Sequence, residues 1–90
     1  MKELKITVDR IIDHCGAMHT KGDCFYVRGQ GKIQIPKDKD FCMYAIQSMI
    51  PFLITKQQED DLPKSDWVTQ TNELCCPDLN GVVFKIEEAK

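Results

Sequence analysis

The feature that most constrains the fold is one apolar segment, residues 41–54, which lies between segments where apolar and polar residues alternate. Within it the residues of one α-helical face recur at steps of three and four: Phe41, Tyr44, Ala45, Ser48 and Met49. Four further apolar residues widen this face: Ile46, Ile50, Phe52 and Leu53. We therefore expect one core helix, beginning near Phe41, whose surface is mostly buried.

The start and the interior of this helix carry further signals. Asp38 or Asp40 can cap the start, because a carboxylate accepts hydrogen bonds from the free amides of the first turn. Pro51 lacks an amide proton and crowds the preceding turn, so we expect a kink or a break near Met49 and Ile50. The segment has fourteen residues, fewer than the roughly 20 that cross a bilayer. No membrane-spanning helix is expected.

Alternating apolar residues predict strands on both sides of the helix. Before it we expect strands over residues 4–8 with a continuation to 12, over 24–28, and over 32–35 as a sheet edge that stops at Pro36. After it we expect a solvated loop over the polar residues 56–65, a weaker strand over 67–76 and a last strand over 82–86. Asn80–Gly81 fits a tight hairpin turn before the last strand.

These elements predict an α+β fold: a small, mostly antiparallel sheet of four or five strands with one main helix packed on it. We expect residues 1–90 to form a single domain, because a 90-residue chain has little material for a second core. Domains of this size often gain stability from a metal, a disulfide or a partner subunit. The five cysteines make such a contribution relevant.

Charge and the N-terminal sequence favour some classes of function over others. The formal net charge is -2, from 12 Lys and Arg against 14 Asp and Glu, so the chain lacks the basic surface that binds nucleic acid. Residues 1–6 contain no apolar signal segment, which favours a cytoplasmic protein. In a reducing cytoplasm cysteines act as thiols, metal ligands or redox groups more often than as disulfides.

The densest group of ligand-type residues lies in the bend between the first two strands. Three residues separate Cys15 from His19, a spacing at which one loop can present a thiolate and an imidazole to the same ion. Cys42 at the helix start, and Cys76 or its neighbour Cys75, can join them if the strand ends meet beside the helix. We therefore predict a metal site of Cys15, His19, Cys42 and Cys76, for zinc or an iron–sulfur cluster.

A second interpretation makes these cysteines chemically reactive. The first turn of a helix favours negative charge, which supports a thiolate at Cys42, although Asp38 and Asp40 place opposing charge nearby. Cys42 or Cys76 would then serve as the nucleophile of a thiol enzyme or redox protein, with His19 as general base.

A third interpretation needs no site at all. Free cysteine is among the most buried residue types, so each of Cys24, Cys42 and Cys75 can be a small core residue of an interaction module. Adjacent cysteines on a strand point to opposite faces, so Cys75 and Cys76 enter one site together only if Pro77 breaks the strand.

Several other polar residues are assigned structural roles. His14 is expected to be solvated or hydrogen-bonded, and Asp23 and Asp78 lie beside turns, where each can accept from backbone amides. The sequence contains no Gly-x-Ser-x-Gly motif and no glycine-rich phosphate loop before a helix. Acyl and phosphoryl transfer are therefore disfavoured.

The order of the motifs resembles a family of small uncharacterised proteins of about this length, found mainly in anaerobic bacteria and archaea. The likeness runs from Ile6 to Ile86 and rests on Cys15-x3-His19-x2-Gly22-Asp23-x-Phe25, Cys42-x2-Ala45 and Cys76-Pro77-Asp78 before Val82-Val83-Phe84. It implies that the meaningful set is Cys15, His19, Gly22, Asp23, Cys42 and Cys76, and it implies no activity. This chain departs from the pattern in Gly16-Ala17 and in the additional thiols Cys24 and Cys75.

Three functions follow as expectations. The first is an accessory metal-binding or iron–sulfur protein rather than an enzyme, the second a thiol redox or cysteine-nucleophile protein, and the third an interaction module. The apolar helix is also compatible with a homodimer or with an accessory subunit of a larger protein.

Overall fold

The computed structural model describes residues 1–78 and 80–89, and these form a five-stranded antiparallel sheet with one main helix. The strand order is β3-β2-β1-β5-β4. The elements are β1 (Leu4–Ile11), β2 (Cys24–Arg28), β3 (Lys32–Gln34), α1 (Met43–Lys56), the 3-10 turn η1 (Glu59–Asp61), α2 (Trp67–Gln70), β4 (Glu73–Cys75) and β5 (Val82–Glu88). The α+β fold expected from the sequence is confirmed.

Strand β1 is the centre of the sheet because it pairs with β2 on one side and with β5 on the other. Ile6 lies opposite Phe25 and Ile86, and all three side chains are buried beneath α1. A register shift between Val8 and Arg10 carries the strand on to Ile11. The alternation of apolar and polar residues therefore predicted the buried face correctly.

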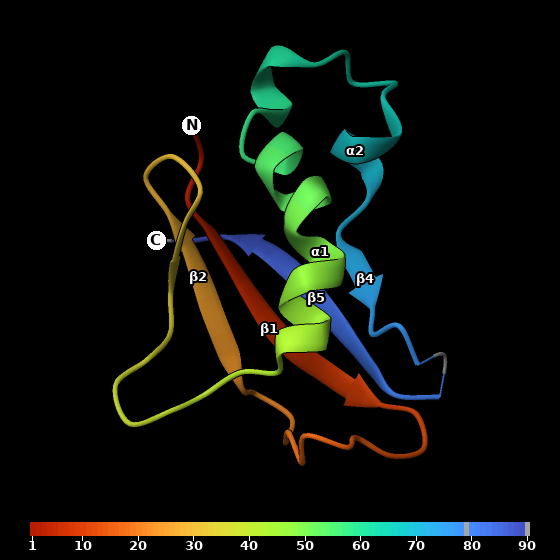
Figure 1. Ribbon diagram of the computed structural model, residues 1–90. Helices are drawn as coiled ribbons and strands as arrows, with labels where there is room; N and C mark the ends of the chain where they lie inside the picture. The colour runs from red at the N-terminus through yellow and green to blue at the C-terminus, as the bar shows by residue number, and fades with distance from the viewer. Residues whose placement is uncertain (79, 90) are drawn as a thin grey trace.

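Helix α1 crosses the face of the sheet formed by β1 and β5 (Figure 1). It buries Ala45, Met49 and Leu53 against the strands, whereas Tyr44 is 75% exposed. The buried stripe is thus narrower than the sequence suggested. The helix also continues through Pro51, so the expected break is absent. Apolar residues on both sides of the proline pack on the same sheet, and this burial outweighs the one missing hydrogen bond.

The helix begins at Met43, close to the expected start near Phe41, but its capping differs from the expectation. Cys42 is the N-cap residue, and neither Asp38 nor Asp40 caps the first turn. The two aspartates instead line a polar pocket next to Thr20 and Asp23. Asp38 has a φ of 63°, which turns the chain there.

The polar segment 56–65 is exposed or half-buried from residue 58 on, as expected, but its first two residues lie inside the protein. Lys56 is 2% exposed, and its ammonium contacts Glu59 Oε1 at 3.0 Å, the Val68 carbonyl at 3.0 Å and Asn72 Oδ1 at 3.1 Å. Gln57 is also buried, and its side chain bonds the backbone next to β1 and in the β2–β3 turn. The sequence-based expectation was wrong here because three acceptors satisfy the buried ammonium, which polarity alone does not reveal.

Residues 67–76 form a short helix and a short strand in place of the expected single strand. Asp66 caps α2 by accepting from the Val68 amide at 2.9 Å. Strands β4 and β5 do pair antiparallel, but Gly81 lacks the positive φ of the expected tight turn. The connection is longer, because β4 ends at Cys75 and β5 begins at Val82. Within the described residues, no helix has the length and apolar character needed to span a membrane.

We expect Lys56→Met to destabilise the protein by about 3 kcal/mol, because it leaves the Val68 carbonyl and the Asn72 amide oxygen without their donor. Lys85→Met is the matched control, since Lys85 is half exposed and pairs with Glu87 at 3.6 Å on the surface. That change should cost less than about 0.5 kcal/mol. Urea unfolding measures both, and equal stability of the two variants would contradict the role of Lys56.

Candidate functional site

Three of the four residues predicted to form a site line one pocket beside the start of α1. Cys15 comes from the loop after β1, Cys42 from the N-cap of α1 and Cys76 from the loop after β4. The pocket has a volume of about 540 Å³. Its walls are otherwise mainly apolar or backbone groups, and we refer to it as the cysteine pocket.

The strand pattern separates the cysteines into two groups. The Cys76 amide donates to the Val82 carbonyl at 2.8 Å, which continues the β4–β5 ladder for one residue. Successive side chains of a strand alternate, so Cys76 turns to the helix side while Cys75 is exposed on the opposite face. Cys24 lies opposite Thr7, whose neighbours Ile6 and Val8 face the helix, so Cys24 also lies on the opposite face.

All five cysteines are free thiols, and none is fully buried. Cys15, Cys42 and Cys76 pack against the edge of the core and are half-buried. A thiol that only fills a core is expected to be enclosed on all sides. The three thiols instead combine contact with the core and access to the pocket.

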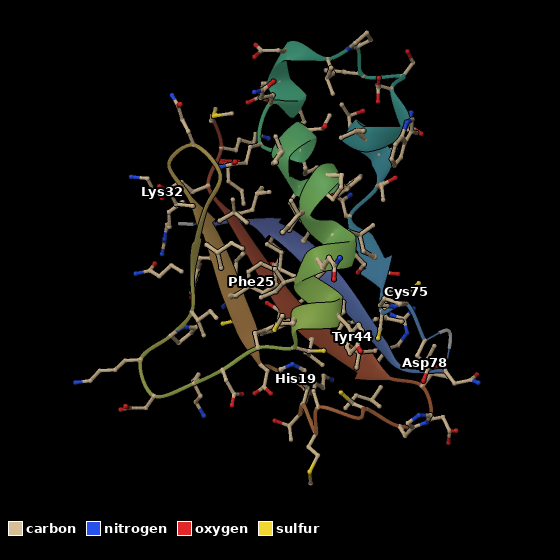
Figure 2. The ribbon with its side chains drawn as sticks, in the orientation of Figure 1. His19, Phe25, Lys32, Tyr44, Cys75 and Asp78 are labelled. Carbon is tan, nitrogen blue, oxygen red and sulfur yellow. The ribbon has the colours of Figure 1, made fainter. Side chains whose placement is uncertain are left out.

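His19 lies below the first turn of α1 (Figure 2) and is 6% exposed. Its Nε2 accepts the Cys42 amide proton at 3.1 Å, and its Nδ1 is 3.0 Å from Asp23 Oδ2. The ring packs on Phe41, with 4.4 Å between the ring centroids. Because Nε2 accepts a hydrogen bond, we assign the ring proton to Nδ1, which donates it to Asp23 Oδ2.

Asp23 is the anchor of this arrangement. Its carboxylate accepts from the Thr20 amide at 3.0 Å, from His19 Nδ1 at 3.0 Å and from the Thr20 hydroxyl at 3.3 Å. These bonds, the Thr20 amide first and then His19, lower the pKa of Asp23 below its ordinary value of 3.8. The expectation that Asp23 binds backbone amides of a turn is confirmed. Asp78 does the same, accepting from the Asn80 amide at 3.0 Å.

The structure therefore gives His19 a different place from the one expected. Both ring nitrogens are engaged within the protein, so neither is free to bind a metal ion or to take a proton from a thiol. In residues 1–78 and 80–89, no three His, Cys, Asp or Glu side chains stand where they could together hold a metal ion. The cysteine pocket is consequently a site of three thiols, with His19 behind it.

The cysteine pocket is also lined by residues that were not predicted to belong to a site, among them His14, Tyr44 and Asp78. His14 is 61% exposed in its side chain and lies 3.4 Å from Asp13 and 3.2 Å from Asp78, which confirms its expected polar surroundings. Tyr44 projects from the first turn of α1 on the side of the Asp78 loop (Figure 2). Tyr44 had been assigned to the core because of its helical spacing. In the structure Tyr44 is exposed at the edge of the buried stripe of α1, so it does not belong to the core.

Comparisons with known proteins do not identify the chain: no protein-family model matches it, and no significantly similar curated protein or solved structure is found. The resemblance noted from the motifs stays a prediction. The assignment of a function therefore rests on the geometry of the cysteine pocket.

Asp23→Asn tests the carboxylate at the base of the site through its dependence on pH. An aspartate whose pKa is depressed by folding stabilises the native state above its unfolded value, and this stability is lost as pH falls through the folded value. The difference in unfolding free energy between the wild type and Asp23→Asn should be largest near pH 7 and shrink below about 3.8. Urea unfolding across this range measures it. A difference independent of pH would show that the charge of Asp23 contributes nothing.

Gly81→Ala tests the close packing of the wall of the pocket. A Cβ at this position would lie 3.1 Å from the Asp78 carbonyl and 3.4 Å from Cys76 Sγ, so the loop or the thiol must shift. We expect a loss of about 1 kcal/mol or more in unfolding free energy. Gly16→Ala is the control, because a Cβ there meets nothing within 4 Å. Equal thermal unfolding temperatures of the two variants would show that the packing around Gly81 is looser than described.

Proposed function

We propose that the protein acts by thiol chemistry in the cysteine pocket, with Cys42 as the nucleophile and Cys15 or Cys76 as the second thiol. The observation that carries this proposal is that three half-buried thiols from three separate segments line one accessible pocket. The other two cysteines lie on the opposite face of the sheet and serve as internal references.

The position of Cys42 supports its role as the nucleophile. It is the N-cap of a fourteen-residue helix, its side chain makes no capping hydrogen bond, and the first turn contains no acidic residue. The free amides and aligned peptide dipoles at this end of a helix stabilise a nearby negative charge. The opposing charges that the sequence suggested, Asp38 and Asp40, line a different pocket.

The reaction that fits this set of thiols is exchange with the disulfide of a partner. The Cys42 thiolate attacks one partner sulfur, which forms a mixed disulfide and releases the other partner sulfur as a thiolate. The thiolate of Cys15 or Cys76 then attacks Cys42 Sγ, which releases the second partner sulfur and leaves an intramolecular disulfide. Two protein thiols are oxidised, one partner disulfide is reduced, and the two thiol protons pass to the partner.

A second candidate function is the binding of a thiophilic metal, as zinc or as an iron–sulfur cluster. The same convergence of three thiols favours it, because thiolates are soft ligands suited to both. His19 would not be a ligand in this case, so the set is Cys15, Cys42 and Cys76 with an open position. The thiols would have to move together on binding, which the two loops that carry Cys15 and Cys76 permit more readily than the helix.

Labelling rates for each cysteine separate these functions. Reduced protein, purified anaerobically without chelator, is treated with limiting iodoacetamide at neutral pH, and each site is quantified by peptide mass spectrometry. We expect Cys42 to react at least about tenfold faster than Cys75, although Cys75 is the more exposed of the two. Cys42→Ser should remove the fast reaction, whereas Cys75→Ser, the matched control, should leave it unchanged.

A chelator distinguishes the remaining outcomes. Slow labelling of all three pocket thiols that becomes fast after chelation, together with stoichiometric zinc or iron, would replace the redox proposal with the metal proposal. Slow labelling of Cys42 with and without chelator would overturn both, and would leave the three thiols as packing groups.

A further inference from the structure

We infer that His19 and Asp23 are positioning residues for Cys42, and that they act on its backbone amide and not on its thiol. This inference rests on the proposed role of Cys42, and it explains why an imidazole that cannot reach a reacting proton lies beside the pocket. An unbroken series of contacts leads from strand β1 to the N-cap residue of the helix.

The series begins at β1. The Val8 amide donates to the Asp23 carbonyl at 2.7 Å, and the Gly22 amide donates to the Val8 carbonyl at 2.9 Å. Gly22 has a φ of 97°, a conformation that side chains disfavour, so a glycine is needed for this turn. The backbone of Asp23 is thereby fixed to the centre of the sheet.

The series continues through the imidazole. Asp23 holds the Nδ1–H of His19, and the opposite nitrogen of the ring accepts the Cys42 amide proton. Phe41 covers the ring and packs in turn on Phe25 and Phe84, at centroid distances of 4.7 and 5.7 Å. The side chain of His19 taken alone is 4% exposed, and its ring is hydrogen-bonded at both nitrogens. It therefore has little freedom to move.

The geometric consequence falls on the N-cap residue. Cys42 has φ −65° and ψ 125°, an extended conformation between the loop and the helix, and its side chain makes no capping bond of its own. Its carbonyl accepts from the Ile46 amide at 3.1 Å within the helix, and the hydrogen bond from its own amide to His19 ties it to the rest of the protein. This arrangement turns Cys42 into the pocket and leaves the first-turn amides of α1 without a competing side-chain acceptor.

The loop between β1 and β2 that holds His19 also carries Cys15, whose carbonyl accepts from the Met18 amide at 2.9 Å. Cys15 and His19 lie in one bend, and the His19 imidazole holds Cys42. The imidazole therefore also helps to fix the positions of the Cys15 and Cys42 thiols relative to each other. The spacing between Cys15 and His19 suggested two metal ligands. In the present inference it brings one thiol and one positioning residue into the same bend.

The test compares His19→Gln with His19→Phe. The glutamine oxygen can accept from the Cys42 amide while its NH₂ group donates to Asp23, so both contacts survive. Phenylalanine keeps the ring that packs on Phe41 but supplies neither bond. The readout is the ratio of iodoacetamide labelling rates at Cys42 and Cys75, measured on variants shown to be folded by circular dichroism.

We expect the Cys42/Cys75 ratio to fall about tenfold in His19→Phe and to stay within about threefold of the wild type in His19→Gln. A residue that only fills space would predict the reverse order, since phenylalanine replaces the ring better than glutamine does. An unchanged ratio in folded His19→Phe would overturn the inference and leave the proposed function intact. A wild-type protein whose Cys42 labels slowly would instead overturn the proposed function.

Amide hydrogen exchange of the wild type gives a separate measurement that needs no variant. The inference requires the Cys42 amide to be protected, because it is bonded inside the protein and not to solvent. Exchange of this amide at the rate of an exposed loop would overturn the positioning role, whatever the labelling rates are.

Discussion

The hydrogen bond from the Cys42 amide to the His19 ring is the contact on which the site depends. It joins the start of the main helix to a turn that is itself bonded to the central strand. The packing at this end of the helix, as residues 1–78 and 80–89 show it, is mainly apolar, and apolar packing is tolerant of small rotations. A directional hydrogen bond in a buried position fixes the orientation of Cys42, the N-cap residue. The geometry of the cysteine pocket depends on that orientation.

The two ends of the helix are secured by different means that serve the same purpose. At the C-terminal end Lys56 and Gln57 are buried and bond to α2, to Asn72 and to the β2–β3 turn. At the N-terminal end His19 takes the corresponding role. Between them Met49 and Leu53 bury the apolar face on the sheet. Polar contacts thus define the position along the sheet, while hydrophobic burial supplies most of the stability.

Local periodicity was enough to predict the sheet and the helix. Ile6, Phe25 and Ile86 lie on one face because strand side chains alternate, and the same rule placed Cys75 and Cys76 on opposite sides. The grouping of Cys15, Cys42 and Cys76 was also predicted, although as ligands of one ion. The roles of His19, Lys56 and the two aspartates before the helix were not. Each depends on which distant group lies within hydrogen-bonding distance, and spacing along the chain carries no such information.

The sequence by itself therefore determined the α+β class, the buried faces of the strands and the opposite orientation of Cys75 and Cys76, because these follow from neighbours a few residues apart. The tertiary structure alone decided that Cys42 is the N-cap residue of the helix and that His19 is hydrogen-bonded at both ring nitrogens. The physical reason is that the burial of a strand or helix face depends on the polarity of its side chains and on their spacing along the chain. A hydrogen-bond partner is supplied by another segment, here 23 positions away, and exists only once the chain has folded.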